Sequence, residues 1–404
     1  MPTIEDVVQS CREQIEDSSF RSVVDWKQRH PGGKVVGYFP VYFPAEIVAA
    51  AGMLPVGIFG GGNRIAVKRA DAHMYSFMCS ICKTTTELAL NGQLAFLDAF
   101  IGHPICDAAR HMPSLLERNM QGLLGDLLYY PGSIGTPLAV PYLRREYVRI
   151  RQLFEHLVGH PIKDEDLRDS IRQYNEARRL TREMYAIRRQ SPWLLTALES
   201  YILTRVGTLL PVQEYIPLLR QVLEQIPKRD RRPIDKVRIV YEGAFCEQPP
   251  LEFIQALEEA CYVVDDDFLL GARLIKGDVA EHGDPLLNLA EAYCNETTYC
   301  STQHDPRRAK SDGFLEKCRT AEAQAVILAP AKFCEPGLDD QVHFMKRAER
   351  EGLPSLQMEF QERMKDFDGI RVQTETFAEA LLFYSESAGV SPESTGTRFT
   401  GVGK

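Results

Sequence analysis

The chain has 404 residues, of which 44% are hydrophobic and 25% charged, a composition typical of globular proteins and unlike that of disordered or fibrous ones. Its 47 basic and 56 acidic residues leave a net charge of −9, which argues against nucleic acid as a partner because phosphate binding needs a surplus of Lys and Arg. No apolar run approaches the about 20 residues that span a bilayer, and the polar N-terminus is unlike a signal peptide. The sequence therefore predicts a cytoplasmic protein without a membrane partner.

The first part of the chain alternates between helical and strand patterns. Residues 3–27 have the apolar spacing of one amphipathic helix, beginning with a capping box at Thr3 and Asp6. Further strands are expected at 34–39, 54–59 and 94–101, with helices at 46–51 and 84–91. This alternation predicts βαβ units and a mainly parallel sheet.

The remainder predicts a helical segment and a second block of alternating elements. Residues 145–235 are rich in Arg, Glu and Leu at helical spacing, and residues 389–404 form a Ser-, Thr- and Gly-rich flexible tail. Strands are expected at 238–241, 262–264, 325–328 and 353–358, and helices at 250–260, 338–351 and 374–387. We therefore expect an α/β protein with two open, mainly parallel sheet domains, flanking helices and a helical segment between them. The domain ranges are 1–33 (N-terminal helix), 34–144, 145–235, 236–388 and 389–404.

Two glycine-rich stretches resemble nucleotide-binding motifs only superficially. Gly60, Gly61 and Gly62 follow a strand but lack the spacing of a dinucleotide-binding fingerprint, so a tight turn is expected there. Residues 401–404 read Gly-Val-Gly-Lys, without the Ser or Thr and the following helix that a P-loop requires. The chain is therefore not expected to bind ATP by itself.

The ten cysteines are expected to be reduced thiols, because disulfides are rare in proteins that are not exported. Three of them, Cys79, Cys106 and Cys334, lie in loops that lead into expected helices; Cys106 and Cys334 directly follow expected strands. Ligands of open α/β sheets gather at such loops, and a helix N-terminus favours the thiolate that ligates metal. Cys79-x-x-Cys82 alone is compatible with half a zinc site or a redox pair, but no second C-x-x-C motif follows. Cys82, one turn further on, is expected to point elsewhere and to pack in the core.

Several segments together resemble the benzoyl-CoA reductase and 2-hydroxyacyl-CoA dehydratase superfamily. Residues 34–56 read KVVGYFPVYFPAEIVAAAGMLPV, with a strand, a P-x-E and an A-A-G-x-x-P, and the resemblance extends to the segments around Cys79, Cys106 and Cys334. The stretches GAFCEQPPL at 243–251 and FGGG at 59–62 look closest to the C (gamma) subunit of ATP-dependent benzoyl-CoA reductase.

The resemblance implies that Cys79, Cys106 and Cys334 hold one [4Fe-4S] cluster, with Cys246 and Cys82 as second-rank candidates. Three thiolates for four irons would leave one iron available to water, substrate or another ligand. Within the superfamily, such a subunit takes part in low-potential electron transfer and in the dearomatising reduction of benzoyl-CoA to a cyclic dienoyl-CoA, in anaerobic aromatic degradation. The implied partners are a homologous second catalytic subunit, ATP-hydrolysing electron-activating subunits, ferredoxin as electron donor and an acyl-CoA substrate.

Three other functions remain open at this stage. The chain is alternatively a subunit of a 2-hydroxyacyl-CoA dehydratase, with the same cluster and a transient one-electron reduction. A homodimeric double-cubane-type reductase would draw on further cysteines such as Cys294 and Cys300. A zinc-stabilised or metal-free scaffold subunit would use the fold for assembly only.

Three groups of polar residues near these segments are weaker candidates. Glu46 belongs to the P-x-E and either lies near the substrate or caps a helix. His103, close to Cys106, either donates a proton or a hydrogen bond or is structural. Asp265, Asp266 and Asp267 follow a strand; too few other oxygen ligands are evident for a cation site, so a solvated turn is expected.

Overall fold

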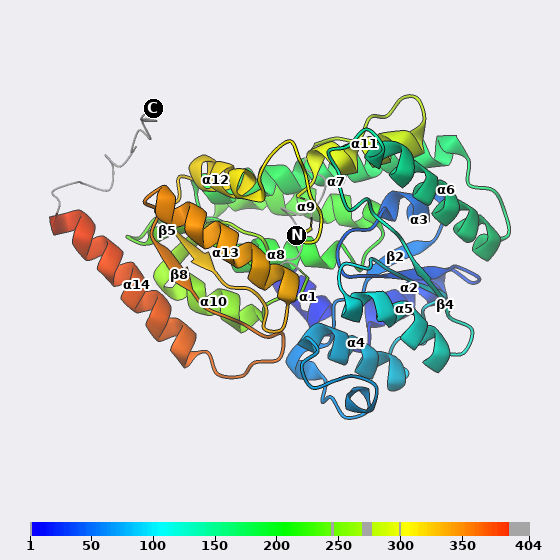
Figure 1. Ribbon diagram of the computed structural model, residues 1–404, viewed down its shortest axis with the longest axis horizontal. Helices are drawn as coiled ribbons and strands as arrows, with labels where there is room; N and C mark the ends of the chain where they lie inside the picture. The colour runs from blue at the N-terminus through cyan, green and yellow to red at the C-terminus, as the bar shows by residue number, and fades with distance from the viewer. Residues whose placement is uncertain (1, 244–245, 269–276, 299, 388–404) are drawn as a thin grey trace.

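The computed structural model describes residues 2–243, 246–268, 277–298 and 300–387 and contains two four-stranded sheets (Figure 1). The first sheet has the order β2-β1-β3-β4 and the second β6-β5-β7-β8, and every strand pair is parallel. The first comprises β1 (Val35–Phe39), β2 (Leu54–Gly57), β3 (Ala99–Gly102) and β4 (Leu124–Leu127). The second comprises β5 (Val237–Glu242), β6 (Cys261–Asp265), β7 (Ala325–Leu328) and β8 (Ser355–Gln357). The predicted α/β fold class with two parallel sheets is thereby confirmed.

The N-terminal region forms two helices, α1 (Ile4–Glu16) and α2 (Arg21–Arg29), so the single helix predicted at 3–27 is wrong. The capping box at Thr3 and Asp6 is present. The helices separate because the side chain of Asp17 accepts hydrogen bonds from the backbone of Ser19 and Arg21, while Phe20 has a left-handed backbone with φ 51°. A short polar side chain that offers the backbone an alternative partner interrupts a helix in this way.

The helices of the first sheet connect its strands and place their N-termini at the carboxyl ends of the strands. They are α3 (Ala45–Ala50), α4 (Ser80–Leu90) and α5 (Asp107–Asn119), with short 3-10 turns at Gly62–Arg64 and Ala70–Ala72. The helix expected at 84–91 begins four residues earlier, at Ser80. The sequence analysis missed β4, because its four residues are all only half-buried and include a glycine and an aspartate.

A helical layer lies between the two sheets (Figure 1). It comprises α6 (Ala139–Val158), α7 (Asp164–Gln190), α8 (Ala197–Val206) and α9 (Val212–Gln225), followed by a 3-10 turn at Ile226–Lys228. Helix α7 is the link, because it contacts α3 of the first sheet and strand β6 of the second. The helical character predicted for 145–235 is present, although α6 starts six residues earlier than that range.

The rest of the chain contains α10 (Leu251–Ala260), α11 (Pro285–Glu296), α12 (Lys310–Thr320), α13 (Glu335–Arg350) and α14 (Asp368–Ser387), of which all but α11 flank the second sheet. Helices α11 and α12 were not predicted; α11 packs on α6 rather than on the sheet. The tail predicted at 389–404 lies outside the described residues, and the domain boundaries stay a prediction.

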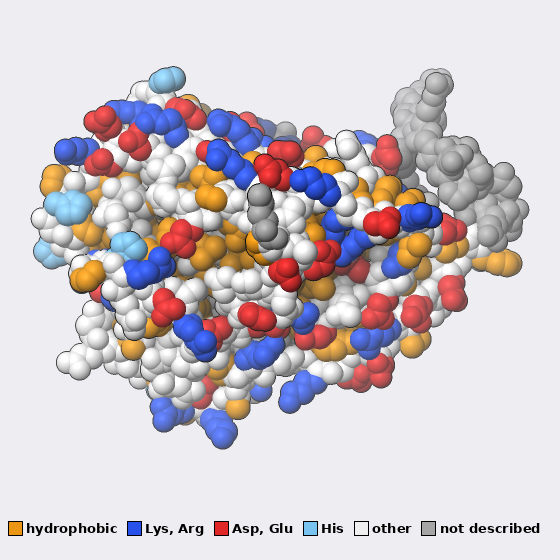
Figure 2. Space-filling view, turned by 180° about the vertical axis from the view of Figure 1, so that it is seen from behind, with side chains coloured by type: hydrophobic (Ala, Val, Ile, Leu, Met, Phe, Trp, Pro, Cys, Tyr) orange, Lys and Arg blue, Asp and Glu red, His pale blue; other side chains and the backbone are white. Residues whose placement is uncertain are grey.

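Charged side chains of both signs are mixed over the face shown in Figure 2, and hydrophobic side chains are visible in a hollow near its centre. Among the helices of the described segments, none combines the length and apolar character required to cross a membrane.

Candidate active site

The three cysteines singled out from the sequence each occupy the N-cap position of a helix. Cys79 precedes α4, Cys106 precedes α5 and Cys334 precedes α13. Cys79 and Cys334 are buried, Cys106 is half-buried, and the Cys106 sulfur accepts a hydrogen bond from the backbone N–H of Ala109 at 3.5 Å. Phe333, directly before Cys334, has a left-handed backbone with φ 66°, a strained conformation that recurs beside functional residues. Three helix N-termini from both sheets therefore present sulfur atoms.

Cys82 was expected to point away from Cys79, but the structure places the two side chains together. The two sulfurs lie 3.4 Å apart and share a hydrogen bond. Because α4 begins at Ser80, Cys79 is its N-cap and Cys82 the third residue of its first turn, and these two positions share one face of a helix. The expectation failed because it placed the start of the helix four residues too late.

Cys246 forms a second close pair with Cys334, at a sulfur-to-sulfur distance of 3.3 Å. It lies in the loop after β5, and Cys334 lies in the loop after β7, the neighbouring strand of the second sheet. The carboxyl ends of adjacent parallel strands meet at one edge of the sheet, which brings these loops together.

Electrostatic coupling joins the two pairs and Cys106 into one group, here termed the thiol cluster (Cys79, Cys82, Cys106, Cys246 and Cys334). The hydrogen bond between Cys79 and Cys82 lowers the pKa of Cys79 and raises that of Cys82. Burial raises the pKa of Cys106 to about 12, with smaller effects from the charges of Cys79 and Cys334. The hydrogen bond with Cys334, followed by burial, raises the pKa of the Cys246 thiol. Burial and the thiol–thiol hydrogen bonds thus shift the pKa values of these thiols in different directions.

The donor set of the thiol cluster fits an iron-sulfur centre better than a single ion. Within the described residues, no three His, Cys, Asp or Glu side chains are close enough together to bind one metal ion. A four-iron cluster spreads its ligands more widely than a single ion does, and soft thiolates are its usual donors. The five thiols come from four separate loops and helix starts.

Two buried carboxylates connect the thiol cluster to the rest of the protein. Glu247 accepts hydrogen bonds from the backbone N–H of Ile81, at 3.3 Å, and of Glu362, at 2.6 Å. Glu362 in turn accepts from Gly62 N and from the hydroxyl of Thr84, both at 2.7 Å. Burial is the main reason that the pKa of both carboxyls is raised. Sequence reasoning missed both residues; Glu247 had a signal, its position next to Cys246, whereas Glu362 had none.

A cavity of about 530 Å³ is lined by the segment after β1 and by residues of α7, α11 and α12. Its wall combines aromatic side chains with charged ones, and no member of the thiol cluster is among the lining residues. These aromatic residues are Tyr38, Tyr42, Phe43, Tyr130, Tyr147, Tyr174, Tyr185, Tyr215 and Tyr293. The sequence analysis did not predict this cavity, because its tyrosines come from segments that lie far apart in the chain.

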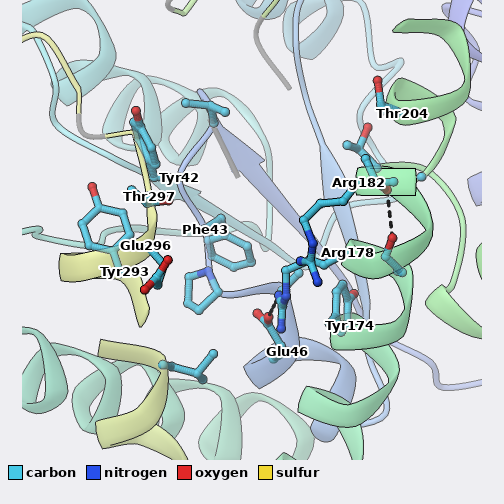
Figure 3. A pocket seen from close by; sticks show the side chains of 18 of the residues that line it. Tyr42, Phe43, Glu46, Tyr174, Arg178, Arg182, Thr204, Tyr293, Glu296 and Thr297 are labelled. Atoms are coloured by element: carbon cyan, nitrogen blue, oxygen red, sulfur yellow. Dashed lines mark hydrogen bonds and ion pairs between the residues drawn. The ribbon is translucent and has the colours of Figure 1, made fainter. Parts of the chain in front are cut away.

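Glu46 lies in the cavity wall, where it faces Arg178 (Figure 3). The two side chains form an ion pair at 2.6 Å, and Arg178 also donates to the Asn175 side chain at 2.7 Å. Ser170 donates to the backbone carbonyl of Glu46 at 2.9 Å, which fixes α3 against α7. Glu46 is therefore held at the cavity by α7 as well as by its own helix.

His103 precedes Cys106 by three residues and packs on two tyrosines of the cavity wall. Its ring packs against Tyr130, with ring centroids 4.6 Å apart, and against Tyr42 at 5.7 Å. Burial lowers the pKa of His103 to about 3, so the ring is neutral at neutral pH. Its Nδ1 is buried and has no hydrogen-bond partner among the residues that the structure describes.

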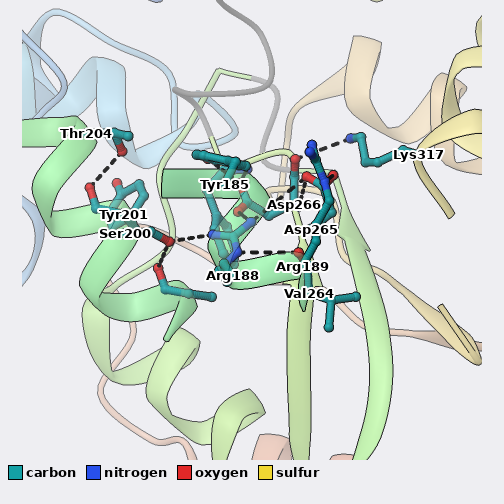
Figure 4. Close-up of polar contacts among 12 residues, drawn as sticks. Tyr185, Arg188, Arg189, Ser200, Tyr201, Thr204, Val264, Asp265, Asp266 and Lys317 are labelled. Carbon is teal, nitrogen blue, oxygen red and sulfur yellow. Dashed lines mark hydrogen bonds and ion pairs between the residues drawn. The ribbon is translucent and has the colours of Figure 1, made fainter. Parts of the chain in front are cut away.

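The three aspartates, the last residue of β6 and the two that follow it, are buried, so the solvated turn expected there is wrong. Asp266 pairs with the fully buried Arg188, and Asp265 pairs with Arg189 at 2.7 Å (Figure 4). These basic side chains come from the end of α7, a segment that the sequence did not place beside β6. Arg188 and Arg189 thus neutralise the charges of Asp266 and Asp265, as a bound cation would do.

Cys294 and Cys300, named for the double-cubane alternative, lie on and after α11. Burial raises the pKa of Cys294 to about 11, and its charged neighbours are Arg307 and Asp305. The Cys300 sulfur lies 3.0 Å from the hydroxyl of Thr302. A role for either thiol in metal binding stays a prediction.

Fold and site define a two-sheet α/β protein whose cysteines converge from both sheets. The chain belongs to the family described as 2-hydroxyglutaryl-CoA dehydratase, D-component, whose sequence model matches residues 40–381. It is 34% identical to the C subunit of benzoyl-CoA reductase from Thauera aromatica, over 94% of this chain and 99% of that protein. It is 26% identical to the (R)-phenyllactyl-CoA dehydratase beta subunit of Clostridium sporogenes, over 87% and 92%. These comparisons confirm the resemblance inferred from the sequence.

Substituting Gly60 should destabilise the contact between the sheets. A Cβ at this position would lie 2.0 Å from Glu362 Oε1 and 2.6 Å from Thr84 Oγ1, and Gly60 has φ +78°. We expect Gly60→Ala to cost at least about 2 kcal/mol, since left-handed strain alone costs roughly 1–2 kcal/mol. Gly52→Ala is the matched control, because Gly52 has φ +74° but open space around it. Equal denaturation midpoints for the two variants would contradict the role of Glu362.

Removing Arg188 should leave Asp266 charged and buried. We expect Arg188→Met to cost about 3–5 kcal/mol in the free energy of unfolding, the usual effect of breaking a buried pair. The control is Arg220→Met, which breaks the exposed pair with Glu176 and should cost under about 1 kcal/mol. Urea denaturation of both variants measures the difference, and a similar small loss for each would refute it.

Proposed function

We propose that the protein is the iron-sulfur subunit of an ATP-dependent benzoyl-CoA reductase. The observation that carries this proposal is the convergence of cysteines at three helix N-termini beside an aromatic cavity. The similarity to the C subunit of benzoyl-CoA reductase over nearly the whole chain supports it. The reaction would add two electrons and two protons to the ring of benzoyl-CoA, giving a cyclic dienoyl-CoA in anaerobic aromatic degradation.

Cys79, Cys106 and Cys334 would hold a [4Fe-4S] cluster, which supplies low-potential electrons one at a time when bound. Their helix N-termini favour a ligating thiolate, against the burial that raises the pKa of the free Cys106 thiol. Cys82 and Cys246 each hydrogen bond to one of these ligands. In this proposal they tune the site, because hydrogen bonds to ligating sulfur influence the potential of a cluster.

The cavity would hold the acyl group of the thioester. Aromatic rings pack well against an aromatic substrate, and the wall supplies them from several directions. Glu46 holds the guanidinium of Arg178 at the cavity by their ion pair. Because the Glu46 carboxylate offsets the charge of Arg178, this pair would orient the substrate through N–H donors and would supply no net positive charge.

His103 would act as a positioning residue. A ring with a pKa of about 3 carries no imidazolium proton to donate at neutral pH. Its packing on Tyr130 and Tyr42 instead fixes the cavity wall that lies nearest to the loop of Cys106.

The partners would be a homologous second catalytic subunit, ATP-hydrolysing subunits and ferredoxin as electron donor. Subunit designations of the relatives support a multi-subunit assembly. A cytoplasmic location fits cysteines that stay reduced.

The second candidate is a 2-hydroxyacyl-CoA dehydratase subunit, favoured by the family description and by the dehydratase beta subunits among the relatives. Anaerobic assays of the complex assembled with its partner subunits separate the two. We expect ATP-dependent loss of benzoyl-CoA with formation of a dienoyl-CoA, and no conversion of 2-hydroxyacyl-CoA. Dehydration of a 2-hydroxyacyl-CoA with benzoyl-CoA untouched would establish the second candidate instead. Purified protein without iron or sulfide would favour a scaffold.

Single cysteine variants test the proposed ligands. Cys79→Ala, Cys106→Ala and Cys334→Ala should each lose most of their iron and sulfide. Cys82→Ala and Cys246→Ala are the matched controls and should retain iron but change the electron paramagnetic resonance spectrum, since each loses a hydrogen bond to a ligand. If either control variant lost as much iron as the first group, that cysteine would be a fourth thiolate ligand. No iron of the cluster would then be left open to another ligand.

A further inference from the structure

Four of the five sulfurs in the thiol cluster are arranged as two close pairs. The sulfurs of Cys79 and Cys82 lie 3.4 Å apart, and those of Cys246 and Cys334 lie 3.3 Å apart. Because a disulfide has an S–S distance of about 2.05 Å, each pair would have to close by only about 1.3 Å to form one. The fifth sulfur, that of Cys106, accepts a hydrogen bond from Ala109 N instead.

The first pair is held together by a single turn of helix. Cys79 is the N-cap of α4 and Cys82 lies three residues further on, so both sulfurs share one face of the helix. This turn is also held from the second sheet, because Glu247 accepts a hydrogen bond from Ile81 N at 3.3 Å. The backbone therefore keeps the two thiols adjacent without any help from a bound metal group.

The second pair is held together by contacts between the loops after β5 and β7. The hydroxyl of Tyr241 donates to the backbone carbonyl of Ala329 at 2.8 Å. Gly243 passes so close to the same carbonyl that a Cβ would lie 2.5 Å from its oxygen. Gly337 leaves room on the other side, where a Cβ would lie 3.3 Å from the Cys334 sulfur. These contacts keep the two loops, and with them the two thiols, side by side.

Each pair combines one proposed ligand of the cluster with one thiol that is not a proposed ligand. The proposed ligands are Cys79 in the first pair and Cys334 in the second, and their neighbours are Cys82 and Cys246. A disulfide in either pair would thus remove one of the three thiolates that the cluster requires. Both pairs lie within one sheet, so neither disulfide would require the two sheets to move relative to each other.

We propose that Cys79–Cys82 and Cys246–Cys334 form reversible disulfides once the chain has lost its cluster, and that these disulfides block reloading until they are reduced. The inference rests on the proposed function for the identity of the ligands. Its purpose would be protective, because a cysteine without a thiol partner is oxidised further to sulfinic acid, which thiol reductants do not reverse. A disulfide is instead returned to two thiols by exchange with a dithiol.

Hydrogen peroxide is the oxidant in this step, and it is small enough to reach buried sulfur. Cys79 is 8% exposed and Cys82 is 1% exposed, so Cys79 reacts first. Its S–H bond is replaced by an S–OH bond as the O–O bond of the peroxide breaks, and one water leaves. The sulfur of Cys82 then displaces the hydroxyl from the sulfenic acid, which forms the S–S bond and a second water. Two electrons and both thiol protons pass to the peroxide.

The first test locates the disulfides in the full chain. Iron is removed by a chelator without oxygen, hydrogen peroxide is added, and free thiols are alkylated in denaturant. The disulfides are then reduced, and the thiols that this releases are alkylated with a heavy-isotope reagent before peptide mass spectrometry. We expect four of the ten thiols to carry the heavy label, namely Cys79, Cys82, Cys246 and Cys334. A digest without reductant should contain Cys79 linked to Cys82 and Cys246 linked to Cys334.

The second test measures reloading with iron and sulfide. The oxidised wild-type chain should take up neither until dithiothreitol is added. Oxidised Cys82→Ala should fail to reload even with dithiothreitol, because its Cys79 has no thiol partner and proceeds to the sulfinic acid. Cys318→Ser is the matched control, since this buried thiol of α12 is in no sulfur pair among the described residues and its loss should leave the wild-type behaviour unchanged.

Disulfides that join a thiol of one pair to a thiol of the other would overturn the inference. Sulfinic acid at Cys79 of the wild-type chain would do so too, as would full reloading of the oxidised chain without a reductant. A complex that reduces no benzoyl-CoA would refute the proposed function, whereas the positions of the disulfides would still support or overturn the inference independently of that assay.

Discussion

The geometry of the site depends on one buried carboxylate that spans the two sheets. Glu247 follows β5 in the second sheet, yet it accepts hydrogen bonds from the first turn of α4, beside Cys82, and from the backbone of Glu362. A buried carboxylate is costly unless its oxygens are satisfied, so these backbone donors hold the two sheets in one relative position. Because Cys246 is its neighbour in sequence, the same contacts bring the thiols of the second sheet to those of the first.

Much of the fold was predictable because local signals agreed with the final structure. The buried strands, such as Val35–Phe39 and Ala325–Leu328, are apolar runs bounded by turns, and the helices after them begin at or beside prolines, Pro44 and Pro336. Strand β4 was not predictable, since it owes its conformation to the neighbour on which it packs. Helix α11 was missed although Asp284 caps it and Pro285 opens it. Local pattern is informative only where tertiary contacts do not decide the conformation.

The site was predictable for its cysteines and unpredictable for its surroundings. A cysteine after a strand has a position that topology determines, so Cys106 and Cys334 could be named in advance. The predicted orientation of Cys82 depended on where α4 begins. It was wrong because the start of α4 was predicted four residues too late. Glu362, Arg178 and Tyr147 reach the site from distant parts of the chain, and no spacing in the sequence connects them.

The division of the thiols between the two sheets has a consequence for the conformational dynamics of the protein. Cys79, Cys82 and Cys106 belong to the first sheet, whereas Cys246 and Cys334 belong to the second. A group that is bound by thiols of both sheets stabilises the contact between the sheets through its binding free energy. Amide hydrogen exchange at the starts of α4 and α13 would then report occupancy of the site, since the loaded protein opens there less often than the empty one. In such a protein, binding of the cofactor and formation of the contact between the two sheets are thermodynamically coupled.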